Sequence, residues 1–291
     1  MLKLKWVIGA AAVLFAALNT TTGADDDTFD LRGPAPTKGQ VFVGKGTLKI
    51  TNADTTMKVA GQTINMKLDL VVTSEEEAKV LAVDGRNVTK CQTKVIKERA
   101  DVSATIDGNK TPPMTEPTAL EKETIISERD GKKWKHALVD TKPSDKQKKE
   151  LDSRNGIEND DDLYPKDKIK VGHTWTVDAA ALNKLLGNSF TDVKGKVDQK
   201  FTKIEEIDGE KVAVINSTAK ITGKMKDDGE PNVDVEMELK ITTWKSLKTG
   251  VSVKETFAGK IKLAGTVKMD DVKAEMTLSG PISGEGTTKL K

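Results

Sequence analysis

Residues 233–241 read Val-Asp-Val-Glu-Met-Glu-Leu-Lys-Ile, so every second side chain is apolar and every side chain between is charged. Successive side chains of a β-strand point to opposite faces, and this alternation therefore predicts a strand with one buried face and one wet face. Antiparallel sheets commonly have one face on a core and the other in water. The stretch favours an antiparallel sheet.

The same period of two extends through much of the chain. It runs through residues 251–269, 272–278 and 213–225, and it returns in the N-terminal half at residues 64–72. Asp-Gly pairs at 84–85, 107–108, 130–131 and 208–209 separate such runs, as expected for tight hairpin turns. We predict a mainly β protein.

These strands are too long to be straight. The 19 residues of 251–269 would span roughly 60 Å at about 3.3 Å each, whereas most strands have about 3–10 residues. Glycine recurs in the apolar phase, at Gly223, Gly259, Gly265 and Gly280. Because glycine inside a strand marks a bulge or a sharp bend, we expect a strongly curved antiparallel sheet or half-barrel.

The N-terminus has the three parts of a secretory signal. Lys3 and Lys5 precede an apolar run of about 13 residues, and small and polar residues follow as far as Ala24. The apolar run is shorter than the roughly 20 residues that cross a bilayer as a helix, so residues 1–24 are expected to be a cleaved signal peptide, with an uncleaved anchor as the alternative. The predicted location is secreted or periplasmic.

The rest of the chain divides by pattern. We expect a flexible lead-in at 25–38, an N-terminal β region at 39–140, a helical connector at 141–188 and a C-terminal antiparallel β region at 189–291, with 39–291 forming one structural unit. Two short helices are expected in the connector, because Ser144 can cap a helix from Asp145 and Asp178 can cap one from Ala179 to Leu186.

Composition excludes several functional classes. The formal charge of +2 falls to zero without Lys3 and Lys5, so the mature chain has no excess positive charge for a nucleic acid partner. The single Cys91 can form no intramolecular disulfide. A transmembrane β-barrel would carry aromatic girdles, but aromatic residues make up only 4% of the chain. We expect a protein that is not integral to the membrane after signal cleavage.

Catalytic motifs are not evident in the sequence. His136 and His173 each lie near a tryptophan in an expected strand, without a nucleophile in a recognisable context. Nucleotide-binding and cysteine-pair motifs do not occur, and we predict no cofactor. A carboxylate-pair glycosidase stays open on composition alone, although sugar sites usually contain more aromatic residues. The prediction is that the protein is not an enzyme.

Residues Asn159, Asp160, Asp161 and Asp162 are a weak candidate for calcium, since hard cations bind several oxygen ligands from one short loop. The run lacks the alternating ligands and central glycine of an EF-hand loop. We therefore interpret it as a solvated loop and predict no metal site.

The segment Lys170-Val-Gly-His-Thr-Trp175, which matches Lys-Val-Gly-x-x-Trp, resembles an element found at mid-chain in uncharacterised secreted bacterial β-rich proteins. It covers about a tenth of the chain with its flanks, and His173 stands where those proteins usually have aspartate. The resemblance implies a loop entering a strand and a structural role for Val171, Gly172 and Trp175. The expected architecture is also similar to that of periplasmic lipoprotein carriers.

The inward face of the sheet leads to two functional hypotheses. One is an exported, envelope-associated structural or interaction protein without catalytic activity, whose partner is an envelope protein. The alternative is a periplasmic or extracellular carrier of an apolar small molecule such as a lipid, held in a curved β cavity. The candidate cavity residues share the inward phase of three C-terminal strands: Met237, Leu239, Phe257, Ile261, Leu263 and Met276.

Overall fold

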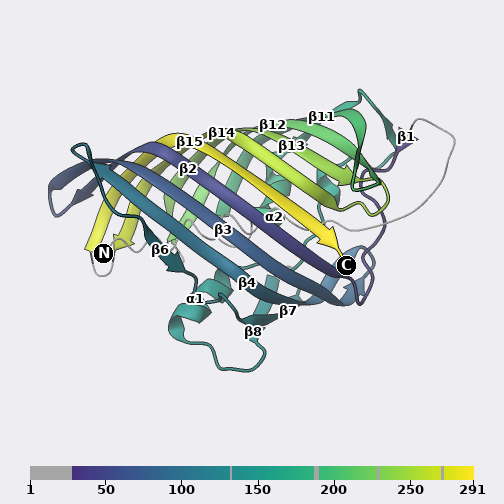
Figure 1. Ribbon diagram of the computed structural model, residues 1–291, viewed down its shortest axis with the longest axis horizontal. Helices are drawn as coiled ribbons and strands as arrows, with labels where there is room; N and C mark the ends of the chain where they lie inside the picture. Colours follow the sequence, from purple (N-terminus) through teal and green to yellow (C-terminus); the bar gives the residue numbers. More distant parts are fainter. Residues whose placement is uncertain (1–27, 132, 187–189, 228–229, 270–271) are drawn as a thin grey trace.

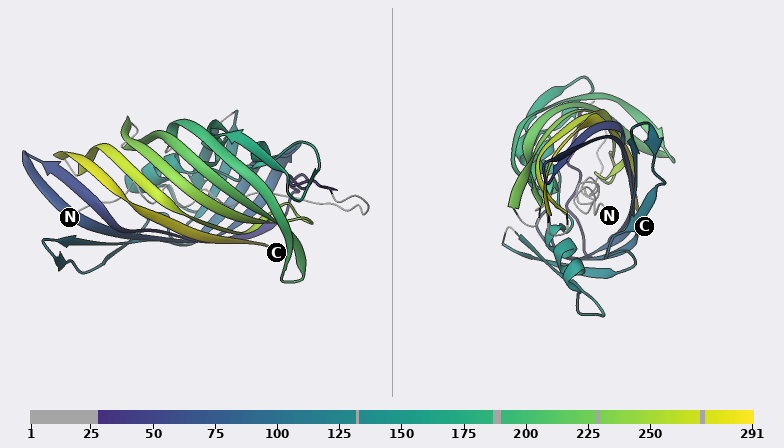
Figure 2. Two further views of the ribbon diagram at one scale, coloured as in Figure 1. Left: turned by 90° about the horizontal axis from the view of Figure 1, so that it is seen from above. Right: turned by 90° about the vertical axis from the view of Figure 1, so that its left-hand side faces the viewer.

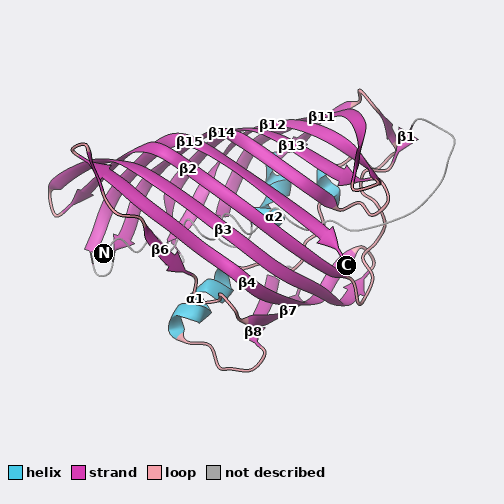
Figure 3. Cartoon of the chain, in the orientation of Figure 1, coloured by secondary structure: helices cyan, strands magenta, loops and turns pink. Residues whose placement is uncertain are grey.

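The protein is described by a computed structural model that covers residues 28–291 except 132, 187–189, 228–229 and 270–271 (Figure 1). The predicted signal peptide at 1–24 and the first three residues of the predicted lead-in lie outside the described residues. Strands dominate the described chain, and the few helical turns lie between residues 145 and 186 (Figure 3).

One antiparallel sheet contains almost all of the strands. Its order is β10-β11-β12-β13-β14-β15-β2-β3-β4-β7-β8, and β5 and β6 pair with β4. The N-terminal strands are β2 (Val41–Val59), β3 (Gln62–Asp84), β4 (Asn87–Ile106), β5 (Asn109–Lys110), β6 (Met114–Pro117), β7 (Thr124–Asp130) and β8 (Lys133–Leu138). The later strands are β10 (Thr174–Asp178), β11 (Phe190–Ile207), β12 (Glu210–Asp227), β13 (Glu230–Ser246), β14 (Ser252–Met269) and β15 (Val272–Leu290).

The sheet is open, because the pairing among the described residues ends at β10 on one side and at β8 on the other. Its long strands coil around a common axis, as the end-on view in Figure 2 shows. The prediction of a mainly β, strongly curved antiparallel half-barrel is therefore confirmed. The last strand, β15, pairs with the first long strand, β2, so the two β regions belong to one sheet.

Close approach between neighbouring strands explains two of the inward glycines. A Cβ atom at Gly259 would lie 1.9 Å from the carbonyl oxygen of Glu238, and one at Gly280 would lie 2.6 Å from the Cβ of Ala53. The pairing of β15 with β2 is also irregular between Ser279 and Ile282. The sheet bends where a larger residue would not fit.

The concave side holds the main hydrophobic core. Its buried residues come chiefly from β2, β3 and β11–β15, and they include Ile50, Leu70 and Val233, each no more than 1% exposed. Charged side chains of the same strands point outward, where pairs such as Lys220 and Glu238 lie across neighbouring strands. The period of two therefore separates core from solvent, as the sequence predicts.

The connector contains one regular helix. This helix, α1 (Asp145–Ser153), is capped by Ser144. The Ser144 hydroxyl accepts a hydrogen bond from the backbone N–H of Gln147, and the Gln147 side chain accepts one from the backbone N–H of Ser144. The second predicted helix is instead a 3-10 turn, η3 (Ala179–Leu182), followed by one α turn, α2 (Asn183–Leu186), with Asp178 as the expected cap. A further 3-10 turn, η2 (Asp161–Leu163), lies between them.

The described part of the predicted lead-in packs against the rest of the molecule. β1 (Thr28–Phe29) pairs with β9 (Ile169–Lys170) in a separate two-stranded sheet. Leu31 is only 3% exposed. Residues 28–31 are thus held by apolar contacts and by a short antiparallel ladder.

The lead-in and the connector together fill one end of the half-barrel, which we call the plugged end. Leu31, Tyr164 and Ile169 form a core cluster there with Phe201 and Ile215 of β11 and β12. Within the described residues, no helix is both long and apolar enough to cross a membrane.

We predict that Gly259→Ala lowers the free energy of unfolding by about 1–3 kcal/mol, because its methyl group would collide with the backbone of β13. Urea unfolding followed by circular dichroism measures the change. The control Lys260→Ala alters an exposed neighbour on the same strand and should change stability by about 0.5 kcal/mol or less. Equal stability of both variants would contradict the close approach.

Candidate functional site

The six residues predicted to line an apolar cavity lie together on the concave face. Met237 and Leu239 come from β13, and the others from β14 and β15; all belong to the main core or pack against it. Three of the six are buried: Ile261, Leu263 and Met276. The remaining three are partly buried: Met237, Leu239 and Phe257. The concave face is thus part core and part uncovered apolar surface.

A small cavity of about 70 Å³ lies at the plugged end, beside this apolar surface. Its aliphatic lining residues are Leu163, Leu182, Leu185, Val197 and Ile241. Its polar lining residues are Asp160, Tyr164, Gln199, Ser217, Thr243, Ser252 and Glu255. The cavity therefore has room for several waters or for a small chemical group.

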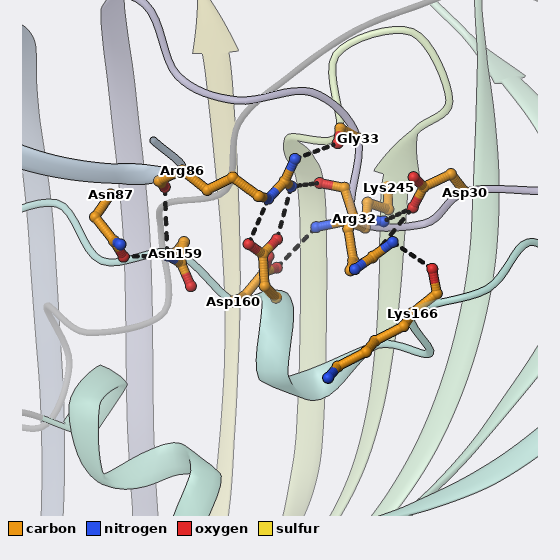
Figure 4. Close-up of polar contacts among 10 residues, drawn as sticks. Asp30, Arg32, Gly33, Arg86, Asn87, Asn159, Asp160, Lys166 and Lys245 are labelled. Atoms are coloured by element: carbon orange, nitrogen blue, oxygen red, sulfur yellow. Dashed lines mark hydrogen bonds and ion pairs between the residues drawn. The ribbon is translucent and has the colours of Figure 1, made fainter. Parts of the chain in front are cut away.

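One lining residue, Asp160, belongs to a buried ion pair. The Nζ of Lys245 donates to Oδ2 of Asp160 at 2.7 Å, and only 1% of the Lys245 side chain and 10% of the Asp160 side chain are exposed (Figure 4). The same ammonium lies 4.3 Å from the ring centre of Tyr164, within reach of a cation–π interaction. The pair links the connector to the end of β13.

The second carboxylate oxygen of Asp160 does not take part in this ion pair. Its Oδ1 atom is buried and has no hydrogen-bond partner within the described part of the chain. Burial raises the pKa of Asp160, and the positive charge of Lys245 opposes that rise. A buried oxygen without a donor is costly, and such an atom calls for an explanation in a native structure.

Glu255 is the second carboxyl of the wall. Its pKa is raised to about 7, chiefly by burial; the nearby charge of Asp160 adds to this rise, and the Thr243 hydrogen bond and the charge of Lys245 oppose it. The hydroxyl of Thr243 lies 3.2 Å from its Oε2. Burial also raises the pKa of the Tyr164 phenol, with Asp160 and Glu255 adding to the effect. Glu255 is therefore partly protonated near neutral pH.

The loop considered for calcium is held by protein groups. Asp161 accepts two hydrogen bonds from the guanidinium of Arg86, at 2.6 and 2.8 Å, and Asp160 is paired with Lys245. Asn159 donates to Asn87 at 2.7 Å (Figure 4). The described residues contain no group of three or more histidine, cysteine or acidic side chains arranged to hold a metal. Calcium would have to displace these cations, so the loop is better explained as a structural anchor.

Arg86 also fastens the lead-in. Its guanidinium donates to the carbonyl oxygens of Arg32 and Gly33, both at 3.0 Å. One side chain of the β3–β4 turn region therefore binds the connector and the lead-in at once, and it helps to close the plugged end.

A second set of buried ion pairs lies nearer to α1. Arg154 contacts Glu98 at 3.0 Å and Glu76 at 3.3 Å, from neighbouring strands. Glu158 pairs with Arg129 at 2.5 Å and accepts from Trp134 at 2.7 Å. Residues 154–161 of the connector are thus tied to the sheet at several successive points.

The two histidines and the cysteine contact other protein groups or are buried in the core. His136 lies 2.8 Å from the Ser127 hydroxyl and 3.1 Å from the Arg154 carbonyl, and burial lowers its pKa. His173 stacks on Trp175. Cys91 is fully buried, and burial raises the pKa of its thiol to about 11, so the reactive thiolate is scarce at neutral pH.

The segment Lys170–Trp175 enters β10 through a turn. Gly172 has a φ of +92°, which favours glycine, and the indole of Trp175 donates to the Leu163 carbonyl at 2.9 Å. Val171 is 46% exposed. Gly172 and Trp175 thus have structural contacts here, whereas Val171 contributes little to the packing.

Sequence reasoning missed Lys245 and Glu255, although a signal was present. Both stand in the apolar phase of their strands, Lys245 four residues after Ile241 and Glu255 two residues before Phe257. A charged residue in the inward phase must be buried or must lie at the end of the core. In this protein both side chains lie close to Asp160 of the connector. The alternation of apolar and polar residues in the strands does not predict where the connector runs.

Comparisons with known proteins identify no relatives by sequence: no family model and no curated protein matches the chain. Among solved structures, an outer membrane channel from Pseudomonas putida is 9% identical, covers 93% of this chain and 100% of its own, and has a TM-score of 0.27. A DUF1329 family protein from Desulfovibrio piger is 8% identical, with 87% and 85% covered and a TM-score of 0.14.

The outer membrane protein OprG from Pseudomonas aeruginosa is 5% identical, with 88% of this chain and 98% of that chain covered and a TM-score of 0.18. All three scores are below 0.5, so we base no functional inference on these likenesses.

We predict that Glu255→Gln removes a pH dependence of stability. The folded-state pKa of about 7 lies above the ordinary value of 4.5, so the proton-linked stabilisation is complete below pH 4.5 and is lost as the pH rises through 7. The shift corresponds to about 3 kcal/mol. Above pH 7 the variant should be more stable than the parent by up to that amount.

Urea unfolding of both proteins between pH 4.5 and 8 measures this difference. The control Glu285→Gln changes an exposed glutamate of β15 and should follow the parent at every pH. If the difference in the free energy of unfolding between Glu255→Gln and the parent does not vary with pH, the raised pKa assigned to this buried carboxyl is wrong.

We predict that Lys245→Met costs about 3–5 kcal/mol of stability, because Asp160 is then buried without its cation. The double variant Lys245→Met with Asp160→Asn should recover at least half of that loss. Chemical denaturation measures both, with Lys240→Met, an exposed lysine of the same strand, as the control. Additive losses in the double variant would show that the two side chains do not form a pair.

Proposed function

We propose that the protein binds an apolar or amphiphilic ligand with an alkyl chain, such as a lipid, along the concave face of its half-barrel. The observation that carries this proposal is a row of partly uncovered apolar side chains in the middle of the sheet. Met237, Leu239 and Ile241 follow one another on the inner face of β13, and Phe257 pairs with Ile241 from β14. We call these four residues the inner strip.

The position of the inner strip supports ligand binding over simple packing. β13 lies between β12 and β14, well inside the sheet, where the core-facing side chains should be the most completely covered. Neighbouring inward residues of the same strand are covered: Val233 is 1% exposed and Val235 is 2% exposed. Uncovered apolar surface of this kind marks binding grooves in other proteins.

The chemistry of the inner strip suits a flexible chain. Methionine, leucine and isoleucine adapt to alkyl groups, and methionine fills irregular gaps with little strain. Binding of this kind needs no catalytic group. The predicted signal peptide supports a secreted or periplasmic carrier, which would shield apolar molecules from water.

An envelope-associated structural or interaction role is the second candidate, and one surface feature favours it. A depression of about 840 Å³ is lined largely by polar side chains of β10–β13, among them Thr174, Asp198 and Lys240. It lies beside β10, which is an end strand of the sheet and pairs with β11. A partner protein could dock there and extend the sheet.

We predict that the mature protein, purified without detergent, retains lipid that native mass spectrometry detects and that organic extraction removes. Leu239→Lys should reduce binding of the fluorescent apolar probe N-phenyl-1-naphthylamine at least tenfold, because an ammonium would be placed in the inner strip. Glu238→Lys introduces the same side chain one residue away on the outer face and should bind as the parent does.

Circular dichroism and thermal melts establish that both variants fold. If the parent protein neither retains lipid nor binds the probe, the carrier proposal fails. Recovery of a specific envelope protein by crosslinking at the polar depression would then support the second candidate.

A further inference from the structure

Exposed apolar side chains gather at the end of the half-barrel opposite the plug. Among the described residues, three of the eight exposed large apolar side chains lie there: Ile64 of β3 and Ile106 of β4, each 37% exposed, and Met114 of β6, which is 44% exposed. The three strands are neighbours, because β3 and β6 both pair with β4. We call these three residues the apolar tip.

The apolar tip belongs to the concave face of the sheet. Ile64 is directly opposite Met57 and Met114 is directly opposite Val102, and both opposite residues are buried in the main core. Side chains of directly opposite residues lie on the same face of a sheet. Ile106 has the same phase as Val102 on β4. The apolar tip therefore extends the core face into solvent.

The apolar tip also projects from the molecule. In the left view of Figure 2, the β2–β3 hairpin and the adjoining ends of β4–β6 reach further from the plugged end than β11–β13 do. Pro112 and Pro113, directly before Met114, are exposed as well. A surface that approaches from this end meets the apolar tip before it meets the rest of the sheet.

The size of the apolar tip favours a lipid surface over a protein partner. A stable protein interface buries about 800 Å² on each partner. The apolar tip offers three side chains, each less than half exposed, which is too little for the core of such an interface. A bilayer needs no minimum area, because each apolar side chain that enters it contributes separately to binding.

The charges beside the apolar tip indicate how it would bind. Three lysines at this end lie in ion pairs with acidic side chains: Lys58 with Glu275 at 3.8 Å, Lys67 with Asp54 at 2.5 Å and Lys110 with Asp69 at 3.6 Å. Attraction to anionic lipids requires a cluster of uncompensated basic residues, which these pairs do not provide. Apolar contact is therefore the main attraction.

We propose that the apolar tip docks the protein on a lipid bilayer, with the side chains of Ile64, Ile106 and Met114 inserted into the boundary between headgroups and acyl chains. The inference goes beyond the proposed function, since docking does not require a ligand on the inner strip. A neutral bilayer is a sufficient target. In a lipid carrier, this end would be the one that faces the membrane.

The test is cosedimentation of the mature protein with sucrose-loaded phosphatidylcholine vesicles. We expect the parent to bind and the double variant Ile64→Ser with Met114→Ser to lose at least about tenfold in partition coefficient, since two apolar side chains no longer enter the bilayer. The control Val139→Ser with Val171→Ser removes two side chains that are each 46% exposed elsewhere, and it should bind within about twofold of the parent. A thermal melt of each variant verifies folding.

A fluorescent label locates the contact. Variants Met114→Cys and Val171→Cys can be labelled selectively, because Cys91 is fully buried and the pKa of its thiol is raised to about 11. Phosphatidylcholine with brominated acyl chains should quench the label at position 114 and leave the label at position 171 unquenched.

Three results would overturn the proposal. The first is a parent that does not sediment with the vesicles, or that binds no better than Ile64→Ser with Met114→Ser. The second is binding that needs phosphatidylglycerol in the vesicles and is lost at about 1 M salt, where charges are screened. The third is a dimer, seen by sedimentation velocity without vesicles, that the same double variant abolishes, since a second copy of the chain would then cover the apolar tip.

The proposed function is tested separately. The double variant at the apolar tip leaves the inner strip unchanged and should bind N-phenyl-1-naphthylamine as the parent does, whereas Leu239→Lys should still sediment with the vesicles. Either proposal can therefore fail while the other stands.

Discussion

The fold depends on one constraint: a very long sheet with a single apolar face has to cover that face with itself. Strands of 17–23 residues, such as β3 and β13, alternate between core and solvent over most of their length. The described helical elements are short, the longest being the nine residues of α1, so no helical layer covers the sheet. Coiling of the strands is what brings apolar side chains of β2 and β3 toward those of β12–β14.

This constraint explains what the sequence could predict. Residues 233–241 have a pattern that only a one-sided strand satisfies, and the inward glycines indicate the bends. The helix after Ser144 was also predictable, because its capping box is local in sequence. The second predicted helix was less secure, since a run of three alanines with one cap allows a 3-10 turn as readily as an α-helix.

The candidate site could be predicted only in part. The apolar residues of the inner strip follow from the alternation, but the polar groups at the plugged end come from residues that are about 85–95 positions apart, Asp160 with Lys245 and with Glu255. A run of acidic residues gives no indication of which cation each will meet. The loop at Asn159–Asp162 resembled a weak calcium site for that reason, whereas Arg86 and Lys245 provide its positive charge.

The buried ion pairs of the connector have a role beyond stability. Replacing such pairs by apolar residues is often neutral or stabilising, so their energetic contribution is small, but each pair has one geometry that satisfies it. Pairs at Arg154, Glu158, Asp160 and Asp161 define where each part of the connector lies on the sheet. They fix the shape of the plugged end and with it the position of the small cavity.

The pairing of β15 with β2 has a consequence for how the chain reaches this structure. The last strand occupies the middle of the sheet, between β14 and β2. Two half-sheets can form early from local hairpins, but they join only after the residues of β15 have left the ribosome or a translocation channel. Until then both halves present a bare central edge, and a chain truncated before β15 would keep two such edges open to aggregation.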